Sequence, residues 1–309
     1  MDSLFFGEAS NAFYSYTDME INRTLDLPVY PPAYYHILGD PKLKYKPKIN
    51  GEIRLIGMDI ATQGGSKNDN TCFSVLSLIP NKSLQYNRSL IYMEVKNGGH
   101  THDQALRLRQ LYEDFEADFV VIDTNGVGIA VYDALVREQV DEERSRVYQS
   151  WNCVNDSKME ERCSDPNAPK VIYSIKATTQ FNSDSAVLLR DCLKRNRIQL
   201  LVGESDAADM LTSNKFYNKL SPEDQTMFQL PYYNTTMFIN ETINLSYELV
   251  NGKIRVSEPA GMRKDRYSSV SYANYIASQL EREILKPTKK NSVQDTFKFR
   301  TPKIRNGAW

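Results

Sequence analysis

The feature that most constrains the fold is a change of hydrophobic period near residue 100. Before it lie three apolar runs, at 53–58, 71–79 and 89–96. Their short polar connections predict an antiparallel meander of three strands. After it, apolar residues at positions 108, 111, 112 and 115 have the spacing of one helix face. A meander followed directly by helical and strand segments predicts a mixed α/β sheet.

The chain then alternates between strands and helices. The run DFVVID, at 118–123, is short and almost wholly apolar, which is typical of a strand buried on both faces. Residues 124–136 return to helical spacing. Further helices are predicted at 183–195, with Asn182 or Ser183 as cap, and at 266–285. A hairpin is predicted to turn at Asn251-Gly252, and 203–242 to be irregular apart from a helix near 205–219.

Composition divides the 309-residue chain into three parts. Residues 1–50 contain five prolines and little periodicity, which predicts an extended linker after a short helical or irregular start. Residues 51–286 are predicted to form one α/β domain. Residues 287–309 are predicted to form a basic tail, because the chain from Lys286 onward has seven Lys or Arg and one Asp. The net charge of −1 predicts no general affinity for nucleic acid, and no apolar run is long enough for a membrane span.

Three aspartates are predicted to stand where these elements begin or end. Asp59 ends the first strand, Asp123 ends the buried strand, and Asp265 stands at the start of the last helix. If the two strands are parallel neighbours, Asp59 and Asp123 project side by side at one sheet edge. A divalent cation would relieve their repulsion, and hard oxygen ligands suit Mg²⁺ or Mn²⁺. Three such carboxylates predict two bound ions and attack of water on a phosphodiester.

Each aspartate also has an ordinary structural interpretation. Asp59 is in a position to open a turn, Asp123 to cap the following helix, and Asp265 to serve as an N-cap. Their joint order, strand, strand and helix, favours the site. Asp69, in the polar turn after the first strand, is most simply a turn residue. The pair His100 and His102 is more typical of a solvated cap than of a metal site.

Basic residues surround the third aspartate. Arg263, Lys264 and Arg266 are candidates to contact the phosphates of a cleaved strand, with a solvated helix face as the alternative. In the tail, cations alternate with Phe297, Phe299 and Trp309. Such a segment suits single-stranded nucleic acid, and docking on a partner protein is an equally good interpretation.

Three motifs carry a resemblance to a known family. The segments GMDIATQGG, VVIDTNGVG and GMRKDRYSSVSYANYIA resemble the acidic motifs of the nuclease domain of viral large terminase subunits, the DNA-packaging motors of tailed phages. FFGEASNAFYSYTDMEINRT resembles the segment that joins the ATPase domain of this family to its nuclease. The resemblance covers most of residues 1–285, and it is carried by the ordered set of motifs rather than by any one of them.

The resemblance implies a fold and an activity. The fold would be an RNase H-like mixed sheet, an antiparallel three-strand meander plus parallel strands, flanked by helices and extended by a β-hairpin. The activity would be metal-dependent cutting of concatemeric double-stranded DNA, with two Mg²⁺ or Mn²⁺ ions held by Asp59, Asp123 and Asp265. The implied partners are the terminase ATPase domain, the small terminase subunit and the portal protein, in the host cytoplasm and transiently at the procapsid portal, with no membrane.

The sequence departs from a complete packaging motor. It contains no GxxxxGK[ST] motif, so we expect no ATPase activity. We therefore expect a terminase C-terminal half, either an excised domain or the product of a split gene. Three alternatives stay open: a resolvase-like nuclease for branched DNA, a non-catalytic module that contacts DNA or portal, and an actin-like phosphotransferase. Ile60-Ala61-Thr62 fits the last of these poorly.

Overall fold

The predicted meander forms the centre of the molecule. The computed structural model describes residues 11–32, 46–61 and 70–285. Strands β2 (Ile53–Asp59), β3 (Thr71–Pro80) and β4 (Tyr86–Lys96) pair antiparallel in that order. Val75 of β3 lies opposite Ile56 on one side and Tyr92 on the other. The antiparallel meander is therefore confirmed.

Parallel strands extend this meander on both sides. β5 (Phe119–Asp123) pairs with β2, and β9 (Lys170–Ile175) pairs with β5, both in parallel. The complete sheet has the order β1-β10-β4-β3-β2-β5-β9-β8. Its outer strands are β1 (Arg23–Leu25), β10 (Ile198–Leu201) and β8 (Asn152–Cys153). The central order β4-β3-β2-β5-β9 confirms the mixed RNase H-like sheet.

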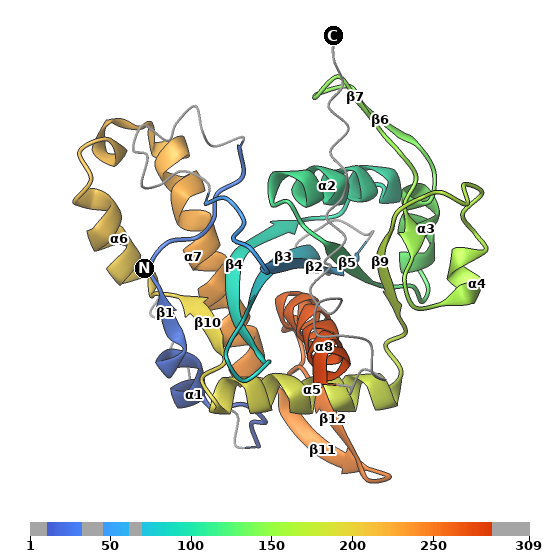
Figure 1. Ribbon diagram of the computed structural model, residues 1–309. Helices are drawn as coiled ribbons and strands as arrows, with labels where there is room; N and C mark the ends of the chain where they lie inside the picture. Colours follow the sequence, from blue (N-terminus) through green and yellow to red (C-terminus); the bar gives the residue numbers. More distant parts are fainter. Residues whose placement is uncertain (1–10, 33–45, 62–69, 286–309) are drawn as a thin grey trace.

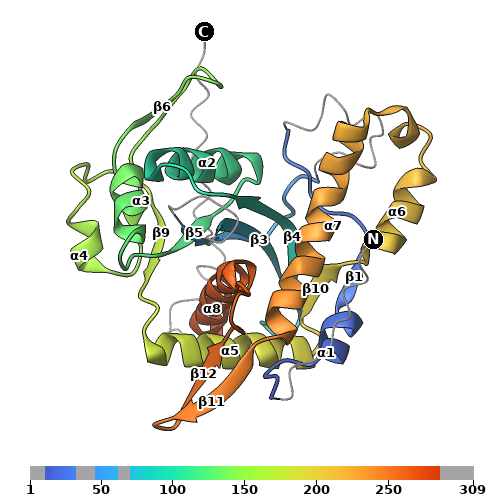
Figure 2. The same ribbon diagram turned by 180° about the vertical axis from the view of Figure 1, so that it is seen from behind.

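Helices cover both faces of the sheet (Figures 1 and 2). On one face lie α2 (Thr101–Asp114) and α3 (Gly128–Leu135), and on the other lie α5 (Thr179–Lys194) and α8 (Asp265–Leu285). Because side chains alternate along a strand, Ile56 packs in the core under α2 while Leu55 packs in the core under α8. No helix in the described ranges is long and apolar enough to cross a membrane.

The remaining elements surround this three-layered centre. The predicted hairpin is confirmed, with positive φ angles at Asn251 and Gly252, as a tight two-residue turn requires. All four cysteines are free thiols. The bounds of these elements are α1 (Tyr16–Ile21), β6 (Gln139–Asp141), β7 (Arg146–Tyr148), α4 (Ser157–Glu160), α6 (Glu204–Thr212), the 3-10 helix η3 (Tyr217–Lys219), α7 (Pro222–Ile243), β11 (Ser246–Val250) and β12 (Lys253–Ser257).

The prediction of a helix near 205–219 is confirmed by α6, whereas the prediction that the rest of 203–242 is irregular is wrong. The segment forms α6 and α7, which are both labelled in Figure 1. Helix α7 has 22 residues. Pro231 lies inside α7, and its buried positions include the polar residues Asn234, Asn240 and Glu241. A helix that buries polar side chains lacks the apolar period from which helices are predicted. Local sequence marks the start of this helix, where Ser221 caps the N-terminus and Pro222 follows it, and tertiary contacts stabilise the rest.

The start of α5 also differs from the prediction. Thr178 is the N-cap, and its hydroxyl accepts a hydrogen bond from the N–H of Phe181. The expected caps, Asn182 and Ser183, lie inside the first turns. These turns are polar, so the apolar period begins about one turn later than the helix itself.

Part of the predicted N-terminal linker packs into the domain. Phe13, Tyr14 and Met19 are buried in the core under α8, and β1 lies at the edge of the main sheet. The hydroxyl of Tyr14 donates to the carbonyl of Ala186 and lies 3.0 Å from the hydroxyl of Tyr267. Residues 11–25 are therefore integral to the fold, whereas the division at 50 and the tail at 287–309 stay predictions; the tail lies outside the described residues.

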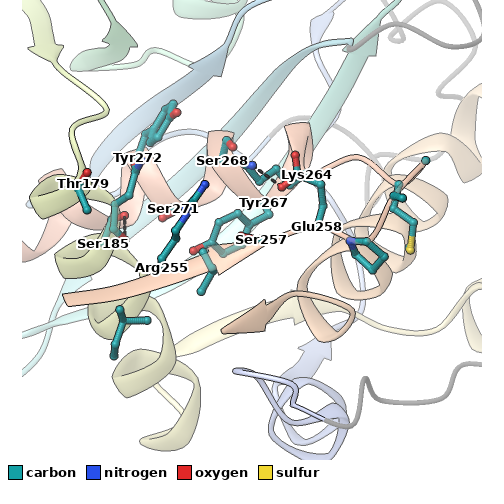
Figure 3. Close-up of a pocket in the computed structure, with 17 residues that line it drawn as sticks. Thr179, Ser185, Arg255, Ser257, Glu258, Lys264, Tyr267, Ser268, Ser271 and Tyr272 are labelled. Atoms are coloured by element: carbon teal, nitrogen blue, oxygen red, sulfur yellow. Dashed lines mark hydrogen bonds and ion pairs between the residues drawn. The ribbon is translucent and has the colours of Figure 1, made fainter. Parts of the chain in front are cut away.

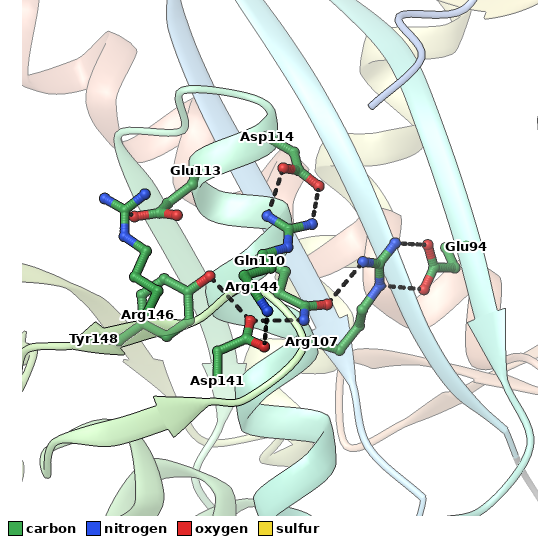
Figure 4. A network of polar contacts seen from close by, with 9 residues as sticks. All are labelled: Glu94, Arg107, Gln110, Glu113, Asp114, Asp141, Arg144, Arg146 and Tyr148. Atoms are coloured by element: carbon green, nitrogen blue, oxygen red, sulfur yellow. Dashed lines mark hydrogen bonds and ion pairs between the residues drawn. The ribbon is translucent and has the colours of Figure 1, made fainter. Parts of the chain in front are cut away.

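A second hairpin, β6–β7, is attached to α2 by a polar network (Figure 4). The buried carboxylate of Asp141 accepts hydrogen bonds from Gln110, from the N–H of Arg144 and from the hydroxyl of Tyr148. Arg144 also forms two hydrogen bonds, of 2.8 and 2.9 Å, with the carboxylate of Asp114. The network fixes a hairpin that has no place in the main sheet.

Candidate active site

The first two aspartates end neighbouring parallel strands. β2 and β5 pair with Met58 opposite Ile122, and the next residues of the two strands are Asp59 and Asp123. Parallel strands that are in register end at the same edge, so both residues stand there together. The strand pairing on which the predicted site depended is therefore confirmed.

Helix α8 brings the third aspartate to this edge. Asp265 is the first residue of α8 and is only 5% exposed. Its Oδ2 accepts a 2.7 Å hydrogen bond from the backbone N–H of Asn70. Asn70 directly precedes β3, in which Cys72 lies opposite Asp59. The contact ties the start of α8 to the edge that carries Asp59.

Asp59 is buried among like charges. Burial raises the pKa of Asp59 well above its usual value, and the charges of Asp265 and Asp123 raise it further. A hydrogen bond from the Ser268 side chain and one from the N–H of Ile60 lower it. Asp59 is thus near enough to Asp265 and Asp123 for their charges to oppose its own, which is the condition that a divalent cation relieves.

Asp123 is held by backbone donors. Its Oδ1 accepts hydrogen bonds from the N–H of Asn125, at 3.1 Å, and of Ala177, at 3.3 Å. Burial nevertheless raises its pKa. Asp123 does not cap α3, whose N-cap is Val127. An ordinary turn thus explains why an aspartate stands at position 123. Neither a turn nor a helix cap explains why three carboxylates lie at one sheet edge.

Very close packing positions α8 against β2. A Cβ atom added to Gly57 would lie 2.1 Å from the backbone oxygen of Ser269, closer than atoms can approach. The hydroxyl of Ser269 donates to the carbonyl of Gly57, at 2.9 Å, and lies 2.8 Å from the hydroxyl of Ser74. Only glycine at position 57 lets the helix approach the strand this closely.

Glu241, near the end of α7, holds the first turn of α8. One of its carboxylate oxygens accepts from the backbone N–H groups of Arg266 and Tyr267, and the other accepts from the Arg266 guanidinium at 2.7 Å. Glu241 is 5% exposed. An acceptor is needed there because the first N–H groups of a helix have no partner inside it. Glu241 therefore fixes the turn that begins with Asp265.

The predicted DNA-contacting cations have separate positions. Arg266 is 9% exposed and pairs with Glu241, so it serves the fold rather than the surface. Its place in the first turn of α8 directs it toward α7. Lys264 is partly exposed and pairs with Glu258. Of the three cations that were predicted to contact DNA, Arg263 and Lys264 stay predictions.

The donor set fits a hard divalent cation in its chemistry. All three side chains are carboxylates, and Asp59 is destabilised by the other two. Across the described residues, however, no three His, Cys, Asp or Glu side chains gather closely enough to form a metal-binding group. An ion would therefore have to draw the carboxylates together. Asp69 lies outside the described residues, and His102 contacts Gln139.

A polar cleft opens beside the carboxylates (Figure 3). It has a volume of about 630 Å³ and lies between α5, β12 and the start of α8. Ser268 lines the cleft and also hydrogen-bonds to Asp59. Tyr272 lines it too, and its pKa is raised by burial and then by the charges of Asp59 and Asp123. Two residues of the lining, Ser268 and Tyr272, thus interact with the acidic edge, while the three carboxylates themselves lie outside the lining.

Sequence reasoning missed Ser268, Tyr272 and Glu241. Ser268 and Tyr272 lie three and seven residues after Asp265, the spacing of one helix face, so helical geometry alone pointed to them. Glu241 gave no such signal, because the helix that carries it was not predicted.

Comparison with known proteins gives structural matches only. No protein-family model matches the chain, and no curated protein matches its sequence. The large terminase nuclease of thermophilic phage G20c, solved with bound magnesium, is 17% identical with a TM-score of 0.46, over 86% of this chain and 98% of that one. The nuclease domain of the large terminase subunit gp2 of bacterial virus Sf6 is 10% identical with a TM-score of 0.46, over 85% and 98%.

A third structure is of the same kind. The large terminase nuclease domain of Thermus phage P74-26 is 16% identical with a TM-score of 0.43, over 85% of this chain and 94% of that chain. These three solved structures are nuclease domains of phage large terminases.

Proposed function

We propose that this chain is a metal-dependent endonuclease that hydrolyses phosphodiester bonds of double-stranded DNA. The observation that carries the proposal is the position of Asp59, Asp123 and Asp265 at one sheet edge, where the charges of the second and third raise the pKa of the first. Three carboxylates at the ends of a strand pair and a helix suit the binding of Mg²⁺ or Mn²⁺.

Asp59, Asp123 and Asp265 would hold two such ions. When bound, the ions would lower the pKa of an attacking water and stabilise the leaving 3′ oxygen. The protein itself orients the ligands: Ser268 fixes Asp59, the N–H groups of Asn125 and Ala177 hold Oδ1 of Asp123, and the N–H of Asn70 holds Oδ2 of Asp265. Such hydrogen bonds set the direction of a ligating carboxylate.

The biological setting is proposed from the motifs. The chain would cut concatemeric phage DNA during genome packaging, together with the terminase ATPase domain, the small terminase subunit and the portal protein. This would take place in the host cytoplasm, at the procapsid portal.

A plasmid assay tests the activity. Supercoiled plasmid is incubated with the protein and Mn²⁺ or Mg²⁺, and nicked and linear forms are measured. We expect cutting that stops when the metal is chelated and that falls at least a hundredfold in Asp123→Asn, a size typical of a lost group that stabilises the transition state.

The matched control is Asp133→Asn, the same change on α3, where the carboxylate pairs with Arg162 away from the edge. It is expected to cut like the unchanged protein. Equal cutting by Asp123→Asn and the unchanged protein would reject the assignment.

A further inference from the structure

We propose that the cleft between β12, α5 and α8 binds the sugar–phosphate backbone of one DNA strand beside the cleaved bond, with Arg255 as its phosphate-binding cation. The inference rests on the proposed nuclease function and adds to it the path of the substrate. It assigns a role to the β11–β12 hairpin, which lies outside the main sheet.

The cleft lies next to residues that surround Asp59 and Asp265. Ser268 belongs both to its lining and to the hydrogen-bonding partners of Asp59. Lys264, another lining residue, directly precedes Asp265. A strand lying in the cleft would therefore continue directly to the three carboxylates.

Many of the side chains that line the cleft are of the types that contact DNA phosphates and sugars. Around the cleft stand short hydroxyl and amide side chains from three elements, which are labelled in part in Figure 3. Contacts of proteins to DNA phosphates and sugars are made mostly by such groups, by Arg and Lys, and by helix N-termini. Thr179, in the first turn of the 16-residue helix α5, adds a helix N-terminus to this wall. The short hydroxyl and amide members of the lining are Thr179, Asn182, Ser185, Ser257, Ser268 and Ser271.

The charged side chains of the lining have an excess of positive charge. Glu258 is the acidic residue of the lining, and it is paired with Lys264 of the same lining. Arg255 then supplies the excess positive charge. Its side chain is 64% exposed, and its contact with Glu248 across the hairpin is long, at 3.4 Å, and open to solvent. Such a surface pair contributes little stability, so a phosphate can take the place of Glu248.

The size of the cleft determines whether one DNA strand or a whole duplex can enter it. A volume of about 630 Å³ is in the range of sites for small molecules and cofactors. It accommodates a short stretch of one strand but not the width of a duplex. The cleft thus contacts one strand, while the rest of a duplex substrate lies outside it.

Binding measurements on the full chain test the inference. A short fluorescein-labelled single-stranded oligonucleotide is titrated in EDTA, which prevents cutting, and anisotropy is recorded at several salt concentrations. We expect Arg255→Ala to weaken binding about fivefold, and to reduce the slope of log K against log[salt] by about 0.7, the contribution of one phosphate contact on a single strand. Arg255→Lys, which keeps the charge, should restore most of the affinity.

The control is Arg195→Ala. Arg195, at the opposite end of α5, is also 64% exposed and pairs with Asp191. Its replacement should leave affinity and slope unchanged. Equal affinity for Arg255→Ala and the unchanged protein overturns the inference, even if plasmid is cut. Loss of binding in Arg255→Ala, with no cutting by the unchanged protein, supports the cleft and rejects the nuclease.

Discussion

At the scale of single residues, the charge of Asp59 lowers the stability of the fold but is needed for the proposed function. Its carboxylate is buried and lies near two others, so its charge is held at an electrostatic cost. The hydrogen bonds from Ser268 and Ile60 offset only part of that cost, because the pKa of Asp59 stays well above its usual value. Residues retained against stability are typical of active sites.

Replacing Asp59 with Asn should therefore stabilise the protein. The amide keeps the shape of the side chain and removes the repulsion, so we expect the free energy of unfolding to rise by about 0.5–2 kcal/mol, the range typical of a single stabilising substitution. Plasmid cutting should be lost. Urea unfolding at neutral pH in EDTA measures the first effect, and lower stability of the variant would contradict it.

At the scale of elements, the contact between α8 and β2 determines where Asp265 lies. Gly57→Ala would force the strand and the helix apart, since its Cβ would collide with the Ser269 backbone. We expect a loss of about 1–3 kcal/mol in the free energy of unfolding, typical of overpacking, and reduced plasmid cutting.

Gly203→Ala is the control for this variant. A Cβ at Gly203 meets its nearest atom at 3.6 Å, an ordinary contact, and the backbone there has a negative φ. Its stability should change by less than about 1 kcal/mol. Equal losses in both variants would show that close approach at Gly57 is not the cause.

The β6–β7 hairpin gives a prediction with a pH dependence. Hydrogen bonds from Gln110, Arg144 and Tyr148 lower the pKa of Asp141 below its usual value, against the effect of its burial. A carboxylate whose pKa is lowered on folding stabilises the protein above its unfolded-state pKa, near 4, and loses this effect as the pH falls. Asp141→Asn should therefore lower the free energy of unfolding by about 1–2 kcal/mol at pH 7.

Urea unfolding of both proteins between neutral pH and about pH 2 checks this. The difference between them should narrow toward the acidic end. A difference that is constant across the range would mean that the charge of Asp141 contributes nothing.

At the scale of the whole molecule, the N-terminal segment joins parts that are distant in sequence. The ring of Phe13 contacts Tyr247 of the β11–β12 hairpin and lies under the guanidinium of Arg190 on α5. Phe13→Ala should lower the free energy of unfolding by about 3 kcal/mol or more. Tyr16→Ala, at a side chain that is 42% exposed, should cost less than about 1 kcal/mol. Chemical unfolding monitored by circular dichroism compares the two; similar small losses would show that the segment is a linker after all.

The sequence was informative where local pattern and tertiary structure agree. The strands of the meander, DFVVID and the Asn-Gly hairpin have periods or turns that need no distant partner, and the order of Asp59, Asp123 and Asp265 followed from them. The apolar period did not reveal α7, because its buried Asn234 and Glu241 are satisfied by Arg266, far along the chain. The local signal that could have predicted its start was the cap Ser221 followed by Pro222. The sequence also could not show that Arg266 faces inward.

The arrangement around Glu241 has a structural consequence. Helix α7 has 22 residues and so spans about 33 Å. Near its beginning Phe228 packs with Tyr30 and Tyr217 in a separate small core, and near its end Glu241 holds the first turn of α8. One helix, with Pro231 inside it, therefore connects that outlying core to the first turn of α8, the helix that begins with Asp265.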